Sequence, residues 1–244
     1  MHADRYHAIF HSEETNWWYK GRRMLLARLA SRLAGGTKLT MLDIGCGTGR
    51  NLMLLGAFGT ACGVDTARSA ITFCRKRHLP NVHLIASNTY PFASTMFNLV
   101  TCLDVIEHEK YERDLLGEAR RVLKRGGTLI ITVPATPLLW SKLDADSHHV
   151  RRYDKRGLQM ILARNGFRIE RISYFNYLLF FPILLIRLFQ KTPLGVHTSW
   201  GIRPDFESSL LNRMLFPLFA LDILSLDYLS PPFGVSLVAV AKKL

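Results

Sequence analysis

The residues best suited to chemistry lie in the stretch LDIGCGTGR, in the first quarter of the chain. Gly45, Gly47 and Gly49 occupy alternate positions, which lets the backbone turn tightly and lie against a ligand without interference from Cβ atoms. A dinucleotide-binding loop carries its third glycine at the sixth position, which is Arg50 here. The carboxylate of Asp43, just before the turn, would repel a pyrophosphate and suits a ligand with a positive amino group. The stretch therefore predicts a small-molecule site that does not bind a dinucleotide.

A second acid, Asp65, ends an apolar stretch at 60–65 and lies 20 residues beyond Gly45. In α/β nucleotide sites, a carboxylate at about this distance accepts hydrogen bonds from ribose hydroxyls. The same acid is also suited to cap the helix that Thr66 begins. Of the two roles, we expect the ribose contact.

The glycine stretch together with Asp65 resembles the first motif of the class I S-adenosylmethionine (SAM)-dependent methyltransferases, of the small-molecule, type 11-like kind. The resemblance covers residues 15–173 and 234–244. In that family, the acid before the glycines orients the methionine end of SAM, and the glycines accommodate it. The resemblance therefore implies SAM as the cofactor. The residues that it assigns to SAM here are Asp43, Gly45, Cys46, Gly47, Gly49, Asp65, Thr66, Asp104 and Arg22.

One segment departs from the family pattern. After the third strand, the family usually has an acid that accepts a hydrogen bond from the adenine amino group, whereas residues 86–88 are Ala, Ser and Asn. We assign the adenine contact to Ser87 and Asn88. The missing acid is also the best support for an alternative, a non-catalytic SAM-binding or membrane-interaction protein.

Two histidines are the candidates for proton transfer. The stretch FNLVTCLDVIEH, which ends at His108, resembles the family's fourth motif and lies where ligands bind in doubly wound sheets, at the carboxyl end of a strand. The loop 148–153 resembles the H-x-R-x-Y segment of methyltransferases that act on small molecules and lipids. Its His149 suits a general base that removes a proton from an attacking hydroxyl. The alternatives are that His108 is a structural residue that caps a helix and that His149 only holds its loop through hydrogen bonds.

A parallel sheet is expected to position these residues. Apolar stretches alternate with helical patterns, and one βα unit after another implies a single Rossmann-like, doubly wound α/β sheet that is mostly parallel. The resemblance adds an antiparallel last strand at 234–244, beside the sixth, so that an insertion separates two edge strands. The predicted strands before the sixth are 38–44, 60–65, 81–85, 97–103 and 126–135, and the predicted helices include 50–55, 112–125 and 154–165.

Ahead of the sheet, residues 12–34 predict one helix that begins at Ser12-Glu13-Glu14. Trp17 and Trp18 either attach this helix to the main domain or form a lid over the cofactor. The W-W-x-x-x-R spacing resembles the leading helix of many small-molecule methyltransferases, in which Arg22 or Arg23 would meet the cofactor carboxylate.

The chain divides into an N-terminal helical lid (1–36), a SAM-binding core (37–173 and 234–244) and an apolar helical insertion (174–233) that contains a polar linker at 191–209. The uncharged run 175–186 is too short for a bilayer about 30 Å thick, which needs roughly 20 residues. Long apolar insertions beside a site are usually functional. This one predicts a substrate lid, a homodimer interface or a membrane contact.

Composition limits the partners. With 244 residues, of which 48% are hydrophobic and 21% charged, the chain has the size and composition of one folded α/β domain. Its net charge of +13 indicates an anionic partner, which is a nucleic acid, a membrane surface or a substrate. The four cysteines lack C-x-x-C spacing, so no metal site is predicted and free thiols in a reducing compartment are expected. Without a signal-peptide pattern, we expect a cytoplasmic protein, peripheral at the inner membrane face if it binds membranes.

These features predict methyl transfer from SAM to a lipophilic or membrane-associated small molecule, at oxygen if His149 or His108 acts as a base. RNA is the alternative acceptor, suggested by the basic charge. Nucleic acid is the weaker choice because the aromatic residues of the insertion lie among leucines rather than among lysines and arginines.

Overall fold

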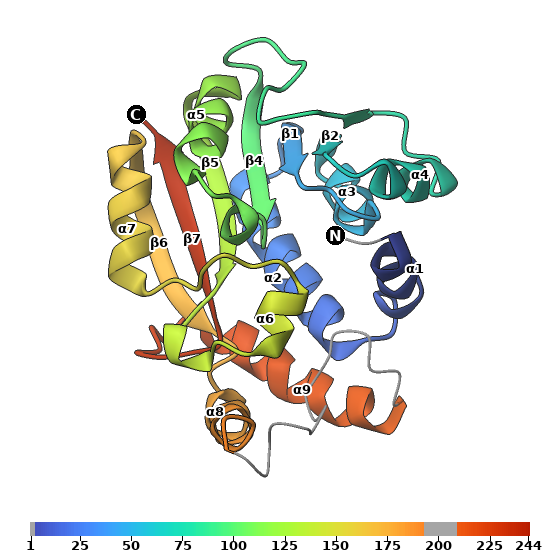
Figure 1. Cartoon of the computed structure of the whole chain (residues 1–244). Helices are drawn as coiled ribbons and strands as arrows, with labels where there is room; N and C mark the ends of the chain where they lie inside the picture. Colours follow the sequence, from blue (N-terminus) through green and yellow to red (C-terminus); the bar gives the residue numbers. More distant parts are fainter. Residues whose placement is uncertain (1–2, 193–208) are drawn as a thin grey trace.

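The computed structural model describes residues 3–192 and 209–244. Within these ranges, seven strands form one sheet in the order β3-β2-β1-β4-β5-β7-β6 (Figure 1). Neighbours from β3 to β5 pair in parallel, whereas β7 is antiparallel to β5 and β6. The strands are β1 (Leu39–Ile44), β2 (Gly59–Asp65), β3 (Val82–Leu84), β4 (Phe97–Leu103), β5 (Leu123–Pro134), β6 (Phe167–Phe175) and β7 (Ser236–Lys243).

The predicted α/β class, the doubly wound sheet and the antiparallel last strand are confirmed. One detail of the prediction was wrong. Strand β7 lies between β5 and β6, so the insertion does not separate two edge strands. Strand β7 is buried along its first six residues, and its side chains join the cores on both faces of the sheet, Leu237 on one face and Val238 on the other, as is typical of an internal strand.

Helices cover both faces of the sheet. Helices α5 and α7 pack on one face and α2 and α9 on the other, because successive strand residues point to opposite sides (Figure 1). On β1, for example, Leu42 joins the first cluster and Met41 the second. The described helices are α1 (Ala3–Ser12), α2 (Trp17–Ala34), α3 (Arg50–Gly56), α4 (Arg68–Lys76), α5 (Glu112–Val122), α6 (Lys142–Asp146), α7 (Lys155–Arg164), α8 (Phe180–Phe189) and α9 (Ser209–Ser225).

The N-terminal region corrects the single helix predicted over 12–34. Helix α1 ends at Ser12, and α2 begins only at Trp17. The side chain of Asn16 caps α2 by accepting a hydrogen bond from the N–H of Trp18 at 2.9 Å. Glu13 is not in a helix, because its buried carboxylate accepts a hydrogen bond from the Thr48 hydroxyl at 2.6 Å and ties this turn to the glycine loop.

The insertion contributes α8 and α9, which lie at the end of the molecule below the sheet in Figure 1. The buried carboxylate of Asp222, on α9, accepts hydrogen bonds from the backbone N–H groups of residues 176–178 at 2.6–3.0 Å, and so fastens the start of the insertion. No helix among the described residues is long and apolar enough to cross a membrane. Most of the predicted polar linker, 191–209, lies outside the described residues.

Helix α2 packs against α9 through aromatic rings. The ring of Phe219 is fully buried, lies 5.4 Å from that of Trp18 in a stacked arrangement and meets Trp17 edge-on at 5.3 Å. Both tryptophans also line the central cavity described below. They therefore attach α2 to the insertion and form part of a cavity wall, while the predicted role as a lid over the cofactor stays a prediction.

Replacing Gly21 with alanine is expected to lower the free energy of unfolding by about 1–2 kcal/mol. A Cβ atom at Gly21 would lie 2.1 Å from Cδ1 of Phe219. Overpacking a filled core costs about 1–3 kcal/mol, and a contact this short should cost about 2–3 kcal/mol, against a gain of about 1 kcal/mol from alanine in a helix. Urea unfolding measures the change. Gly56→Ala, at the end of α3 with open space around its Cβ position, is the control and should be neutral or stabilising.

Candidate active site

A cavity of about 530 Å³ lies at the carboxyl ends of the parallel strands. Its wall includes the glycine loop, the inner side of α2, the residues that follow β4, part of the segment 143–152 and one side of α8. Doubly wound sheets bind ligands at this edge because the loops after neighbouring strands diverge there. One cavity therefore joins the predicted cofactor residues to the predicted catalytic histidines.

Most of the predicted residues line this cavity, and three do not. Those that line it are Arg22, Gly45, Cys46, Gly47, Asp65, Thr66, Asn88, Asp104, His108 and His149. Asp43 is buried and Ser87 is exposed, and neither is part of the wall; Gly49 precedes α3 as its N-cap. A direct contact of these three with a cofactor stays a prediction.

The glycine loop has the backbone that its sequence predicts. Gly45 has a φ of +68° and Gly47 a φ of +55°, a region that side chains with a Cβ rarely adopt. A Cβ at Gly45 would also lie 2.5 Å from Val105, whereas one at Gly47 would have no neighbour within 4 Å. The backbone at Gly47 is therefore open to the cavity.

Asp65 holds the loop as well as facing the cavity. Its carboxylate accepts hydrogen bonds from the N–H of Gly47 at 2.9 Å and from the N–H of Ala67 at 2.8 Å. Burial raises the pKa of Asp65, and these backbone donors act against that rise. The predicted alternative, a cap for the following helix, is not observed, because α4 has Ala67 as its N-cap and Asp65 holds only the turn before it; the ribose contact stays a prediction.

Asp43 is buried behind the cavity wall, whereas Asp65 is part of that wall. Asp43 accepts a hydrogen bond from the Thr101 hydroxyl at 2.6 Å, and its other oxygen is buried without a partner among the described residues. Burial raises the pKa of Asp43 to about 7. An unpartnered acid behind an open glycine loop, with a second acid at the ribose position, fits a nucleoside that also carries an amino group, as SAM does.

Arg22 and Asp104 form an ion pair across the cavity wall. Arg22 also donates to the Thr132 hydroxyl at 3.1 Å, and that hydroxyl donates to Asp104 at 3.0 Å. This network joins α2 to the ends of β4 and β5. The two residues that the resemblance assigns separately to SAM are therefore paired with each other in this structure.

The cavity wall beside Asn88, one of the residues predicted to contact adenine, contains an acid that the sequence pattern did not indicate. The side-chain amide of Asn88 donates to Glu109 at 3.1 Å, and both residues line the cavity. Glu109 follows β4, whereas Asn88 follows β3. The two residues are 21 positions apart, so the sequence does not indicate that they are neighbours. Glu109 supplies a carboxylate close to the segment where the family usually has one.

His149 is oriented by a carboxylate. Its Nδ1 lies 3.0 Å from Asp144, which also accepts hydrogen bonds from Arg152 at 2.8 and 3.1 Å. Burial acts to raise the pKa of Asp144, but the hydrogen bonds from His149 and Arg152 outweigh this effect and hold the pKa at about 2. An ionised Asp144 favours the tautomer with a proton on Nδ1, which leaves Nε2 of His149 as the basic atom.

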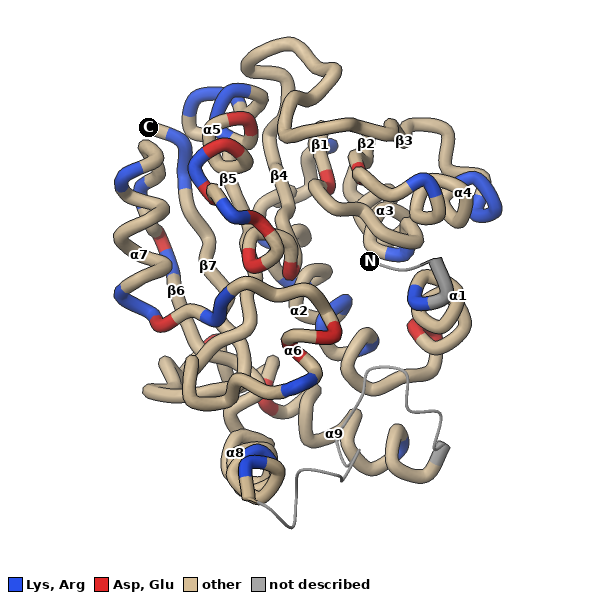
Figure 2. The backbone as a smooth tube through the Cα atoms, in the orientation of Figure 1, with Lys and Arg blue, Asp and Glu red and all other residues tan. Residues whose placement is uncertain are grey.

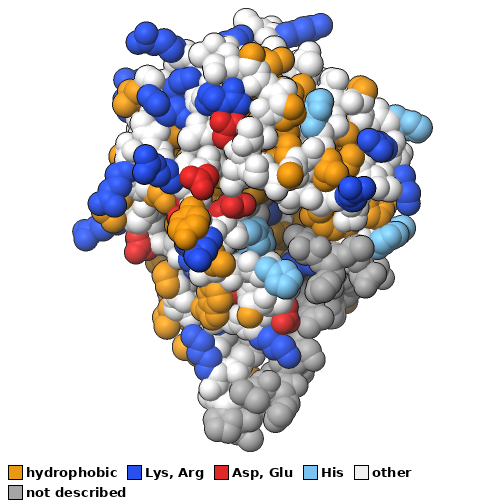
Figure 3. Space-filling model, turned by 45° about the horizontal axis from the view of Figure 1, so that its top comes forward, with side chains coloured by type: hydrophobic (Ala, Val, Ile, Leu, Met, Phe, Trp, Pro, Cys, Tyr) orange, Lys and Arg blue, Asp and Glu red, His pale blue; other side chains and the backbone are white. Residues whose placement is uncertain are grey.

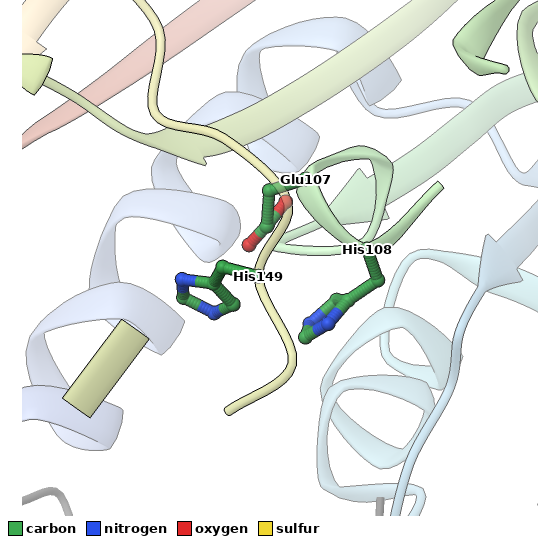
Figure 4. A group of neighbouring side chains, drawn as sticks. All are labelled: Glu107, His108 and His149. Carbon is green, nitrogen blue, oxygen red and sulfur yellow. The ribbon is translucent and has the colours of Figure 1, made fainter. Parts of the chain in front are cut away.

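His108 and Glu107 lie beside His149 (Figure 4). The two imidazole rings are 4.8 Å apart, edge to face. Burial, followed by the charge of His149, lowers the pKa of His108 to about 4, so this ring is neutral above that pH. Glu107 is fully buried, and neither carboxylate oxygen has a partner among the described residues. Burial raises the pKa of Glu107, and nearby Asp104 raises it further.

Comparison with known proteins agrees with this geometry. Residues 42–131 match a family model described as a methyltransferase domain. A probable SAM-dependent methyltransferase of Mycolicibacterium smegmatis is 26% identical over 162 residues, or 64% of this chain and 62% of that protein. The mitochondrial ubiquinone biosynthesis O-methyltransferase of Schizosaccharomyces pombe is 31% identical over 147 residues, or 52% of this chain and 53% of that protein. The chain thus spans less than two thirds of the length of these two relatives.

The fold is also found in solved structures. A SAM-dependent methyltransferase from Archaeoglobus fulgidus aligns over 91% of this chain and 94% of its own with a TM-score of 0.57, at 22% identity. The methyltransferase-domain match and the named relatives together support a class I SAM-dependent methyltransferase, and the open glycine loop agrees with that assignment.

Proposed function

We propose that the protein transfers a methyl group from SAM to a hydroxyl oxygen of a lipophilic small molecule. The observation that carries this proposal is the single cavity that joins the glycine loop and Asp65 to His149 and to the apolar helix α8. When bound, SAM supplies an electrophilic methyl group on a sulfonium. The reaction is an in-line displacement, so the main task of the protein is to hold the acceptor against that methyl group.

The residues around the glycine loop are suited to hold the cofactor. The open backbone at Gly47 permits close approach, and Asp65 can accept hydrogen bonds from ribose hydroxyls. Asn88 and Glu109 lie where adenine would be recognised. Arg22 or Arg23, which both line the cavity, can pair with the carboxylate of SAM.

His149 is suited to remove the proton of the attacking hydroxyl. With Nδ1 directed to Asp144, its Nε2 is the atom that accepts a proton, and Asp144 stabilises the imidazolium that forms. His108 is a weaker base because its pKa is lowered to about 4. An oxygen acceptor is favoured by this pair, since a carbon or amine acceptor has less need of a base.

Helix α8 gives the acceptor side of the cavity its character. Ile183, Ile186 and Arg187 line the wall, and Arg187 is buried in an otherwise uncharged helix. Burial lowers the pKa of Arg187, and the nearby charge of Arg152 lowers it further. An apolar wall with one guanidinium suits a lipophilic molecule that carries a partly negative group.

The insertion is also suited to rest on a membrane surface. Large apolar side chains are exposed along α8 and α9; those more than half exposed are Phe181, Leu185, Leu210, Met214 and Leu221. Figure 2 shows Lys and Arg concentrated on α4, α5 and α7, with few charges on α8 and α9. In Figure 3, basic side chains are spread over the visible face among scattered hydrophobic ones. A peripheral position at the inner membrane face would bring a lipophilic acceptor to the cavity.

The fission-yeast relative acts, by its name, as an O-methyltransferase in ubiquinone biosynthesis. This name supports an oxygen acceptor on a lipophilic molecule for the present chain. The direct test is transfer of labelled methyl from SAM into extracts of the source cell, separated into lipid, aqueous and RNA fractions. We expect label in the lipid fraction. If only the RNA fraction carried label, RNA would be the acceptor in place of a lipophilic small molecule. SAM binding without methyl transfer would favour a non-catalytic protein.

Replacing Leu185 and Phe181 with glutamate is expected to reduce sedimentation with anionic liposomes at least about fivefold, because two charges would have to enter the apolar part of the interface. SAM affinity should not change. Met160→Glu on α7 is the matched control, since Met160 is also about half exposed but lies away from the insertion. If Met160→Glu reduced liposome sedimentation equally, membrane association would be due to the basic helices of the core and not to the insertion. Association between copies of the chain, lost in the double variant, would indicate a homodimer interface instead.

A further inference from the structure

The side chains of Glu107, His108 and His149 converge on one space beside the acceptor end of the cavity (Figure 4). One potential ligand atom from each of them lies within 4.8 Å of the others. Glu107 and His108 follow β4, whereas His149 comes from the loop that precedes α7. The cluster therefore depends on two loops that only the fold brings together.

Glu107 is the least expected member of this cluster. Its carboxyl group is completely buried, and neither oxygen has a hydrogen-bond partner among the described residues. A buried carboxyl group without a partner is energetically unfavourable, so such groups usually have an unseen ligand or a function. Its two nearest candidates for a shared ligand are the imidazoles of His108 and His149.

A histidine that binds a metal ion through one ring nitrogen can donate a hydrogen bond from the other. In both histidines here, one ring nitrogen already has such a partner. His149 directs Nδ1 to the carboxylate of Asp144 at 3.0 Å, and His108 directs Nδ1 to the backbone oxygen of His148 at 3.3 Å. Metal-binding histidines usually donate their second ring N–H to a carboxylate or carbonyl in this way. In both rings, Nε2 is then the atom with a free lone pair.

We propose that Glu107, His108 and His149 bind one divalent first-row transition-metal ion, with Zn²⁺ as the best match. Two imidazoles and one carboxylate are a common ligand set for zinc and related ions, and they leave at least one position open. Magnesium prefers oxygen ligands and fits this set poorly. At metal–ligand distances of about 2.0–2.2 Å, tetrahedral ligand atoms lie roughly 3.4 Å apart. The ligand atoms now lie within 4.8 Å of one another, so binding of the ion would draw them closer together.

The open position would serve the acceptor. A hydroxyl bound to the ion loses its proton more readily, and the proton leaves to water at the cavity mouth. The resulting oxygen forms the new C–O bond as the C–S bond breaks and its electron pair returns to sulfur, which gives the demethylated cofactor. This role rests on the proposed methyl transfer, whereas binding of the ion does not. With a metal present, His149 acts as a ligand and no longer as the base.

Titration of the chelator-treated, full-length protein with Zn²⁺, Mn²⁺ and Mg²⁺ tests the site, with calorimetry and elemental analysis as readouts. We expect one Zn²⁺ per chain and much weaker binding of Mg²⁺. Glu107→Gln, His108→Ala and His149→Ala should each weaken Zn²⁺ binding at least about tenfold, and Asp144→Asn about tenfold through its effect on His149. Absorption bands of the Co²⁺ form should reveal nitrogen ligands and change in the His108→Ala variant.

His83→Ala is the control, because His83 is an exposed histidine on β3 outside the cavity. No Zn²⁺ binding by the wild type, or equal affinity in all the variants, would overturn the proposal. SAM affinity, measured on the same samples, verifies that each variant is folded. If SAM does not bind while Zn²⁺ does, the proposed function fails and the metal site stands. If SAM binds and Zn²⁺ does not, Glu107 is a buried neutral acid and the base remains His149.

Discussion

Asp222→Ala is expected to lower the free energy of unfolding by about 3 kcal/mol, because three backbone N–H groups lose their acceptor together. Leaving a buried donor unpaired costs about 1–3 kcal/mol, and water can reach the less buried groups of Tyr177 and Leu178. For a chain of this size, each kcal/mol corresponds to about 2–4 °C, so the Tm should fall by roughly 6–12 °C. Thermal and urea unfolding measure the change.

Asp227→Ala is the matched control, since Asp227 lies just beyond the same helix. Its carboxylate pairs with Arg28 and Arg32 near the surface, where ion pairs contribute about 0–1 kcal/mol. The two variants should therefore differ by at least about 2 kcal/mol. Asp222→Asn, which keeps one acceptor oxygen, should lie between them. Equal stabilities of the two alanine variants would mean that Asp222 does not fasten the insertion.

Asp65→Ala is expected to weaken SAM binding by about 10- to 100-fold, or roughly 1.4–2.8 kcal/mol. The lower value corresponds to the lost hydrogen bonds between a charged group and the ribose hydroxyls. The higher value adds the loosened glycine loop, because the N–H of Gly47 would lose its partner at 2.9 Å. Calorimetry with SAM and with its demethylated product measures both effects.

Two further variants separate these contributions. Asp65→Asn keeps an acceptor for the loop but loses the charge, so we expect the smaller effect. Asp114→Ala removes an exposed acid on α5 that does not line the cavity and should leave the affinity unchanged. An unchanged affinity in Asp65→Ala would remove this residue from the cofactor site and leave it with only its hydrogen bonds to the backbone of Gly47 and Ala67.

The strand pattern and the glycine loop could be predicted because both depend on neighbours in the sequence. Runs of apolar residues formed strands, and their ends were correct within a few residues, although β5 begins at Leu123 rather than at 126. The N-terminal helix was misplaced because two polar side chains compete there. Asn16 caps the helix, while Glu13 pairs with Arg77 and Thr48 in another part of the chain.

The sequence by itself determined the cofactor side of this protein. The positions of Gly45, Gly47 and Asp65 follow from one strand, one turn and the next strand, and parallel pairing of β1 with β2 brings them together. Only the tertiary structure decided what surrounds the two candidate histidines. Asp144 orients His149, and Glu107 faces it from the loop after β4, about 40 residues away. Such convergence depends on which strands are neighbours and how their loops pack, and no local spacing of residues encodes it.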